Sequence, residues 1–380
     1  MTTPISPERA VFDLPSLGDA AISPDGSRIA YVRSHVDRET AKAGRQIWIV
    51  NADGTGKRQL TYIGSNGEPT WSPDGTALAY VSRRDGDLPF AISLMRFDGG
   101  EPAVLTTHAA APSSLVWSDD GKTIAYQKPV DPANPNETPR DPKAPPAVRV
   151  VKRIDYKQDG IGYVNDVRNQ IFLLDVETGE RRQLTRDLVD HTKPDWSPDG
   201  ASLAVIVSNR NGQRTQLGVV NVATGTVTLH GDYDGEVGLP SWSPDGKTIF
   251  VQGDARGMPH HGIFTLDVAS GAFTSLIEDP EFYLDGTILS TTVPIWLDNG
   301  NVLVSAQHHG TSGLLTVAPA TGEIGPVGFW AATHVGLSVS ADGTTIVQTS
   351  NDLDGAVSIV RIDRTTGERT TLFDEAEEFF

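Results

Sequence analysis

Two pairs of adjacent histidines, His260-His261 and His308-His309, are the first candidates for metal binding or base catalysis in this chain. Neighbouring residues of a strand point to opposite faces, so neither pair can hold one ion as histidines one turn apart on a helix can. We therefore expect structural or solvent-exposed roles for both pairs. The chain has no cysteine, which excludes disulfides, thiol catalysis and cysteine-based zinc sites. No cofactor and no metal site is predicted.

Aspartates form a second set of candidate acid–base groups, because Asp25, Asp74, Asp199 and Asp245 each lie in the same tetrapeptide, Ser-Pro-Asp-Gly. Proline presets φ for the first turn position and glycine accepts a positive φ, so this tetrapeptide closes a tight hairpin turn. A catalytic pair of carboxylates has no reason to recur at regular intervals along a chain. We expect these aspartates to cap turns.

A serine nucleophile of the hydrolase type would lie in a Gly-x-Ser-x-Gly elbow between a strand and a helix, and no such pentapeptide occurs. The nearest approach is Gly-Leu-Ser-Val-Ser at 336–340, which lacks the last glycine. The chain also lacks the alternating strand and helix pattern that would hold an acid and a histidine behind the serine. We expect no catalytic residue in this chain.

Binding chemistry is concentrated in residues 148–166, where Arg153, Tyr156, Lys157 and Tyr163 are mixed with carboxylates and glycines. Arginine and tyrosine are the usual anchors of interfaces, so this segment could hold a peptide or a neighbouring domain. It follows a stretch, 128–149, that contains seven prolines and is predicted to be an extended insertion.

The elements around these residues repeat. Seven turns of the Ser-Pro-Asp-Gly type begin at positions 23, 72, 118, 197, 243, 297 and 340, with intervals of 43 to 54 residues except for one of 79 that contains the insertion. A tryptophan stands directly before five of these turns, and short apolar runs rich in β-branched residues follow them. Such a period with strands inside it predicts an all-β, seven-bladed β-propeller of four-stranded antiparallel blades. The first blade starts near Asp19 and the last ends near Phe373, so we expect the ring to close without strand exchange between the termini.

Composition agrees with one large all-β domain, with 38% hydrophobic residues among 380. We divide the chain into a lead-in, 1–18, the propeller, 19–373, and the start of a linker, 374–380. A net charge of −18 argues against a nucleic-acid partner. Residues 1–10 are polar and carry no apolar core, so no signal peptide and no membrane span are predicted and a cytoplasmic location is expected.

Three segments together resemble the N-terminal propeller of prolyl oligopeptidase family serine peptidases, in particular the acylaminoacyl-peptidase-like branch. These are residues 23–32, the pentapeptide Gln-Ile-Trp-Ile-Val at 46–50, and the loop with Arg153-Ile154-Asp155-Tyr156, Asp159-Gly160 and Gly162-Tyr163. The resemblance covers essentially the whole chain. It adds Asp155 and Arg256 to the candidate contact residues, because Arg256 lies where the family often carries an exposed Arg-Gly loop.

The resemblance implies a non-catalytic domain that gates and orients peptide substrates. The chemistry would belong to an α/β-hydrolase domain of the same protein, absent from this chain, and residues 374–380 resemble the segment that leads to it. The implied partners are this hydrolase domain and short or N-blocked peptides, and the sequence leaves oligomerisation open.

Two alternatives remain at this point. One is a stand-alone binding propeller like that of the bacterial Tol system, which recruits protein partners. The other is a propeller hydrolase with an axial metal, for which the inner strands offer the carboxylates of Glu68 and Asp195.

Overall fold

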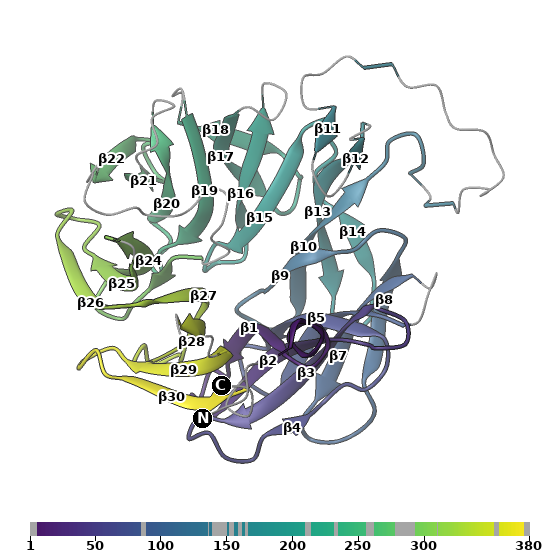
Figure 1. The fold of residues 1–380 in the computed structure, drawn as a ribbon. Coiled ribbons are helices and arrows are strands. Elements are labelled where there is room, and N and C mark those ends of the chain that lie inside the picture. The colour runs from purple at the N-terminus through teal and green to yellow at the C-terminus, as the bar shows by residue number, and fades with distance from the viewer. Residues whose placement is uncertain are drawn as a thin grey trace.

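Thirty strands and one short helix make up the computed structural model, which describes residues 6–84, 89–135, 137–138, 150–151, 156–158, 162–163, 166–209, 214–231, 235–255, 262–277, 293–309, 311–352 and 357–375. Twenty-eight of the strands form seven four-stranded antiparallel sheets arranged in a ring, as Figure 1 shows. The prediction of a seven-bladed propeller is confirmed.

Blades 1 to 4 are built from consecutive strands, apart from a two-stranded hairpin inserted in blade 3. Blade 1 contains β1 (Ser16–Ile22), β2 (Arg28–Val36), β3 (Ala43–Asn51) and β4 (Arg58–Gln59). Blade 2 contains β5 (Ser65–Trp71), β6 (Ala77–Arg83), β7 (Phe90–Arg96) and β8 (Ala103–His108). Blade 3 contains β9 (Ser113–Trp117), β10 (Thr123–Val130), β13 (Arg168–Asp175) and β14 (Arg181–Gln183), and its hairpin is β11 (Lys157–Gln158) and β12 (Gly162–Tyr163). Blade 4 contains β15 (Asp190–Trp196), β16 (Ser202–Asn209), β17 (Arg214–Asn221) and β18 (Val227–His230).

Blades 5 to 7 complete the ring in the same order. Blade 5 contains β19 (Gly235–Trp242), β20 (Thr248–Ala255), β21 (Gly262–Asp267) and β22 (Phe273–Ile277). Blade 6 contains β23 (Ile295–Trp296), β24 (Val302–His308), β25 (Thr311–Val317) and β26 (Ile324–Trp330). Blade 7 contains β27 (Ala332–Val339), β28 (Thr345–Asp352), β29 (Val357–Asp363) and β30 (Arg369–Asp374).

The recurring Ser-Pro-Asp-Gly turn joins the first two strands of a blade. In blade 1, Asp25 Oδ1 accepts hydrogen bonds from Ser23 Oγ (2.5 Å) and from the N–H of Ser27 (3.1 Å), while Gly26 has φ of 71°. Ser23 Oγ in turn accepts from the N–H of Arg28 (3.0 Å), the first residue of β2. The turn therefore uses serine, aspartate and glycine for separate geometric reasons, and the predicted capping role of the aspartates is confirmed.

In four blades, the tryptophan before the turn bonds its blade to the preceding one. The indole N–H of Trp71 donates to the carbonyl of Ala21 in blade 1 (3.0 Å), and Trp117, Trp196 and Trp296 make the same bond with their own preceding blades. Seven buried apolar clusters accompany these bonds, one at each interface between neighbouring blades. The core of this molecule thus lies between sheets rather than at one centre.

The ring closes without strand exchange, because blade 1 uses β1–β4 and blade 7 uses β27–β30. Polar contacts hold this seam in addition to a shared apolar cluster. The N–H of Ile22 donates to Ser338 Oγ (2.9 Å), and Glu375, only 9% exposed, pairs with Arg33 (3.1 Å) and Lys57 (2.9 Å) of blade 1. The predicted mode of closure is confirmed.

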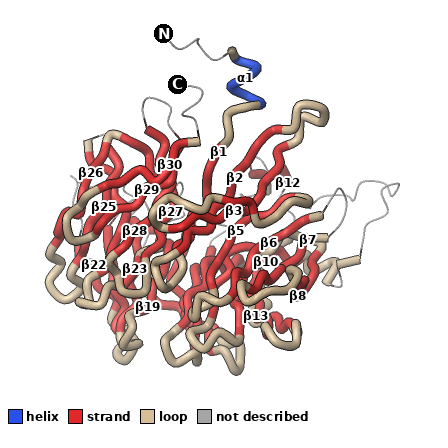
Figure 2. Tube along the Cα trace, turned by 90° about the horizontal axis from the view of Figure 1, so that it is seen from below, coloured by secondary structure: helices blue, strands red, loops and turns tan. Residues whose placement is uncertain are grey.

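The two faces of the ring differ. Helix α1 (Pro7–Phe12) stands on one face, close to the end of β30, as Figure 2 shows. Arg38, in the β2–β3 connection, fixes the helix through ion pairs with Glu8 (2.8 Å) and Asp13. We call this face, where the first strand of each blade begins, the terminal face, and the opposite face, which carries the Ser-Pro-Asp-Gly turns, the turn face.

Candidate functional site

The innermost strands share an unusual backbone position. In six blades, one residue of the first strand, three places before the end of that strand, has a left-handed backbone conformation, and the pairing with the second strand shifts around it. The six residues are Asp19 (φ 50°), Glu68 (52°), Ser114 (54°), Lys193 (53°), Leu239 (53°) and Gly336 (73°). We call them the channel ring. All of them except Leu239 line, with other inner-strand residues, a cavity of about 630 Å³ on the axis of the propeller.

Two carboxylates of the channel ring join successive blades. Asp19 Oδ2 accepts from the N–H of Glu68 (3.2 Å) and from the guanidinium of Arg45 (2.8 Å). Glu68 Oε2 accepts from the N–H of Ser114 (2.7 Å), the next member of the ring. From blade 3 to blade 4 the pattern changes, since the N–H of Lys193 donates to Gln127 Oε1 (2.7 Å). These side chains compensate for the cost of a left-handed conformation, which is about 1–2 kcal/mol per residue other than glycine.

Three acids, Asp19, Glu68 and Asp195, and one cation, Lys193, line the channel. Burial raises the pKa of Glu68 above its ordinary value, although the Ser114 N–H and the charges of Lys193 and Arg45 oppose the rise. Burial also raises the pKa of Asp195 to about 7, against the hydrogen bond that it accepts from the N–H of Trp242 (2.7 Å). The channel therefore holds a carboxyl group that is partly protonated near neutral pH, and the ammonium of Lys193 carries a positive charge into it.

The insertion in blade 3 begins after residue 130, later than the predicted start at residue 128. Residues Lys128, Pro129 and Val130 still belong to strand β10. The ammonium of Lys128 is buried against Glu137 of the insertion and over the ring of Phe172 (4.8 Å). Glu137 also accepts from the N–H of Ala109 in the connection after blade 2 (2.7 Å). The start of the insertion is thus tied down over blades 2 and 3.

Three of the six predicted contact residues lie in the described part of the insertion. Lys157 and Tyr163 face each other in the β11–β12 hairpin, and the Lys157 ammonium lies 6.0 Å from the centre of the Tyr163 ring. Tyr156 lies 6.3 Å from the same ring, and Tyr156 and Tyr163 are 44% and 49% exposed. Arg153, Asp155 and Arg256 lie outside the described residues, so the structure leaves their predicted roles as predictions.

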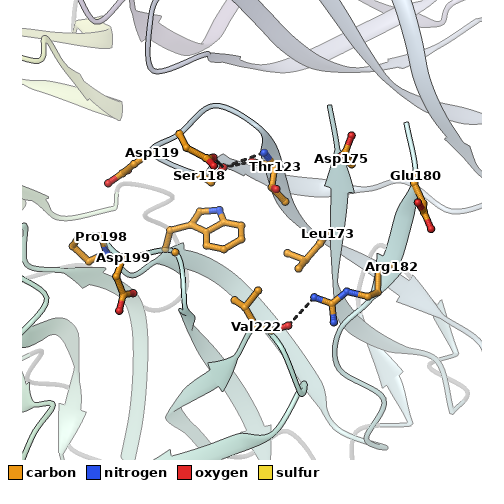
Figure 3. Close-up of a pocket in the computed structure, with 13 residues that line it drawn as sticks. Ser118, Asp119, Thr123, Leu173, Asp175, Glu180, Arg182, Pro198, Asp199 and Val222 are labelled. Atoms are coloured by element: carbon orange, nitrogen blue, oxygen red, sulfur yellow. Dashed lines mark hydrogen bonds between the residues drawn. The ribbon is translucent and has the colours of Figure 1, made fainter. Parts of the chain in front are cut away.

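A groove between blades 3 and 4 opens on the turn face and is shown in Figure 3. Its wall is joined across the blades by Arg182, whose guanidinium donates to the carbonyl of Val222 (2.7 Å). Three of the five acids that line it cap turns: Asp120 accepts from Ser118 Oγ (2.7 Å), Asp199 from Ser197 Oγ (2.6 Å) and Asp175 from the N–H of Thr178 (2.8 Å). Much of the acidity of the groove therefore follows from turn capping.

The histidine pairs supply no metal site in the part of the chain that the structure describes. His308 and His309 pack edge to face, with ring centres 4.1 Å apart, and His308 also contacts Phe329 (5.5 Å). His260 and His261 lie outside the described residues. Among the described residues no group of three or more histidine, aspartate or glutamate side chains could hold a metal ion, and no helix is long and apolar enough to cross a membrane.

The sequence analysis missed the channel ring, Lys193 in particular. One signal was present: Glu68-Pro69, Lys193-Pro194 and Leu239-Pro240 each stand in the same place before a tryptophan. Proline cannot donate to a ladder and marks bulges within sheets, so this recurring X-Pro pair indicates an interruption of the inner strand.

Comparison with known proteins shows what this chain is similar to. Residues 13–134 match the model of the TolB beta propeller domain. The chain is 34% identical over 190 residues to the uncharacterized peptidase YuxL of Bacillus subtilis, covering 49% of this chain and 28% of that protein. It is 24% identical over 280 residues to dipeptidyl-peptidase 5 of Porphyromonas gingivalis, covering 57% of this chain and 41% of that protein. The aligned part thus spans less than half the length of either relative.

Solved structures share the fold. Acylaminoacyl peptidase of Pyrococcus horikoshii superposes with a TM-score of 0.73 at 15% identity, over 97% of this chain and 54% of that chain. The β-propeller domain of the Trilobed protease from Pyrococcus furiosus, described as having an open velcro topology, has a TM-score of 0.64 at 14% identity and covers 95% of this chain and 99% of that one. The predicted resemblance to the propeller domains of these peptidases is confirmed.

Proposed function

We propose that this propeller is the non-catalytic domain of a serine peptidase of the acylaminoacyl peptidase or oligopeptidase type, and that it gates and orients peptide substrates. The α/β-hydrolase domain of the same protein would supply the nucleophile. The relatives support this proposal, because they are peptidases and each is longer than the region aligned with this chain.

The observation that carries the proposal is the uneven distribution of exposed apolar side chains. Eight of the twelve large apolar side chains that are exposed among the described residues project at or near the terminal face, from α1, from the connections that follow the fourth strands and from the insertion: Val11, Tyr62, Ile63, Val150, Val151, Tyr156, Tyr163 and Leu188. None of the exposed large apolar side chains found in the described residues lies in a Ser-Pro-Asp-Gly turn. Exposed apolar groups gathered on one face favour a covering partner.

The course of the chain favours the hydrolase domain as that partner. Helix α1 and the end of β30 lie together on the terminal face (Figure 2), so a domain joined to either end of the propeller would meet this face first. A domain seated there would cover the mouth of the axial channel and enclose a chamber. Enclosure strengthens electrostatic interactions at a reacting carbonyl and restricts substrates by size.

The test is the size and reactivity of the native gene product. An antibody raised against this propeller should detect, in its host, a species heavier by an α/β domain, and a fluorophosphonate probe should label that species. The isolated chain of 380 residues should remain unlabelled. A native product of 40.7 kDa would overturn the proposal in favour of a stand-alone binding propeller.

The contact residues are tested in the longer protein. Replacing Tyr156 and Tyr163 together with alanine should reduce peptide turnover and weaken the association of the two domains, because this pair presents exposed aromatic surface on the insertion. Leu229→Ala is the control, since Leu229 is similarly exposed (49%) but lies on the outer strand β18. Equal kinetics for the double variant and the control would remove the hairpin from the interface.

A further inference from the structure

Blade 6 is almost uncharged, although the chain as a whole has a net charge of −18. Residues 295–330, which span its four strands, contain two charged side chains, Asp298 and Glu323, whereas 21% of these 36 residues, the average of the chain, would be about eight. Both acids lie in connections on the turn face, and the four strands contain no aspartate, glutamate, lysine or arginine. Four further acids precede the blade in residues 278–292, which lie outside the described residues.

The outermost strand of this blade is the longest fourth strand that the structure describes. β26 has seven residues, whereas the fourth strands of the other blades have two to six. It lies at the outer margin of the ring, at the left of Figure 1. Edge strands are commonly protected from contact with other chains by charged side chains, by proline or by a bulge. β26 has no charge, and its protection consists of the exposed Pro326 and a bulge in its pairing with β25.

Two aromatic rings cover the end of β26 that lies toward the terminal face. Phe329 and Trp330 are neighbours in the strand, so their side chains point to opposite faces of the sheet. The Trp330 ring lies over Gly328 and the Phe329 ring over Gly313 of β25, because a Cβ on either glycine would collide with the ring. Each ring also packs against a histidine ring of β27 or β24, with ring centres 5.4 and 5.5 Å apart. Both rings are therefore held in place and remain partly exposed, as aromatic anchors of interfaces are.

The distribution of charge selects the partner for this edge. Two copies of a chain with a net charge of −18 repel each other wherever their acidic surfaces meet. In an interface with two-fold symmetry each surface patch meets its own copy, so a second chain can approach most closely at an uncharged patch. A basic partner, in contrast, would be attracted to the acidic parts of the molecule rather than to blade 6.

We propose that two copies of this chain associate through the outer edge of blade 6, with Phe329 and Trp330 of each copy at the contact. Side chains rather than a continuous hydrogen-bonded ladder would make this contact, because Pro326 lacks an N–H and the bulge interrupts the edge. The inference goes beyond the proposed function and does not rest on it. The second copy would lie at the side of the ring, whereas the hydrolase domain is proposed to cover the terminal face.

Sedimentation velocity of the chain of 380 residues, from about 1 to about 100 µM, tests the association. We expect a species of twice 40.7 kDa whose share rises with concentration and with salt, because salt screens the repulsion between two acidic copies. Pro326→Glu should weaken the dimer at least about tenfold, because like charges would then face each other at the contact. In native mass spectrometry, an equimolar mixture of Pro326→Glu and Pro326→Lys should form mixed dimers in preference to either homodimer. Val104→Glu is the matched control, because Val104 is 50% exposed on the outer strand β8 of blade 2.

Each outcome decides the inference. A monomer at every concentration and salt would overturn it, and so would a dimer that Pro326→Glu leaves unchanged or that Val104→Glu weakens equally. Random pairing of the two Pro326 variants would also count against it. Far-UV circular dichroism and thermal melting confirm that the variants are folded. A monomeric chain would leave the proposed function standing, and a native product of 40.7 kDa would refute the proposed function without touching this result.

Discussion

Asp195, in the innermost strand β15 of blade 4, provides a test of how burial of a carboxyl group affects the stability of the propeller. Its carboxyl group accepts from the N–H of Trp242 in the next blade (2.7 Å), and burial raises its pKa to about 7 from 3.8 in an unfolded chain. Between these two pKa values the folded protein binds a proton that the unfolded chain releases. The free energy of unfolding should therefore fall as pH rises from about 4 to about 7, and change no further from this group above that range.

The magnitude follows from the difference between the two pKa values. A difference of about three units corresponds to about 4 kcal/mol at 1.36 kcal/mol per unit, which is an upper bound because the side chain borders the channel. Asp195→Asn keeps an oxygen that can accept from Trp242 and cannot ionise. We expect it to match the wild type within about 1 kcal/mol at pH 4 and to be about 2–4 kcal/mol more stable at pH 8.

Urea denaturation at pH 4, 5, 6, 7 and 8 measures this difference. Asp245→Asn is the control, since this turn carboxylate has a lowered pKa, so its replacement should leave the pH dependence of stability between pH 4 and 7 unchanged. Parallel stability curves for wild type and Asp195→Asn would refute the reasoning, because they would mean that Asp195 titrates as it does in the unfolded chain.

Three further predictions concern the repeat and the seam. Trp71→Phe should destabilise the protein more than Trp242→Phe, by about 0.5–1.5 kcal/mol in chemical denaturation. Both rings are 8% exposed, but of the two only the Trp71 indole N–H has a hydrogen-bond acceptor among the described residues. Equal losses of stability would contradict this. Glu375→Gln should lower the free energy of unfolding by about 1–2 kcal/mol and speed hydrogen exchange in β1 and β27, because it removes the charged partner of Arg33 and Lys57 at the seam. The control, Glu323→Gln at an exposed position, should change neither quantity. Hydrogen bonds from Ser23 and Ser27 lower the pKa of Asp25 to about 2, so Asp25→Asn should flatten the acid limb of a pH–stability profile between about pH 4 and 2, by no more than about 1 kcal/mol for this exposed group; an unchanged acid limb would count against it.

The blades could be predicted from the sequence because their turns repeat by residue type. Serine, aspartate and glycine each satisfy a separate bond or dihedral requirement of the same turn, so the tetrapeptide recurs wherever the turn does. Tryptophan before the turn recurs for the same kind of reason, because in four of five cases its indole N–H donates to the preceding blade. Period and residue type together determined the number of blades and the way the ring closes.

The hairpin β11–β12 and the channel ring could not be predicted in this way. The hairpin consists of two pairs of residues and lies in an insertion without a repeat, although the Asp159-Gly160 dipeptide is a turn signal. The ring residues share no residue type, since six types occupy the six positions, and a following proline marks only three of them. A pattern search based on residue type passes over a position whose backbone is constant and whose side chain varies.

That variation is where this propeller can acquire specificity. Blade geometry needs only an interruption of the inner strand, and a glycine satisfies it, as Gly336 does. Asp19 and Glu68 join neighbouring blades, and Leu239 fills the interior, so the ring has residues committed to stability. Lys193 has no such commitment beyond its backbone. Because six residue types occupy this position within one ring, likeness of fold cannot transfer a ligand from one propeller to another, and the channel residues themselves must be tested.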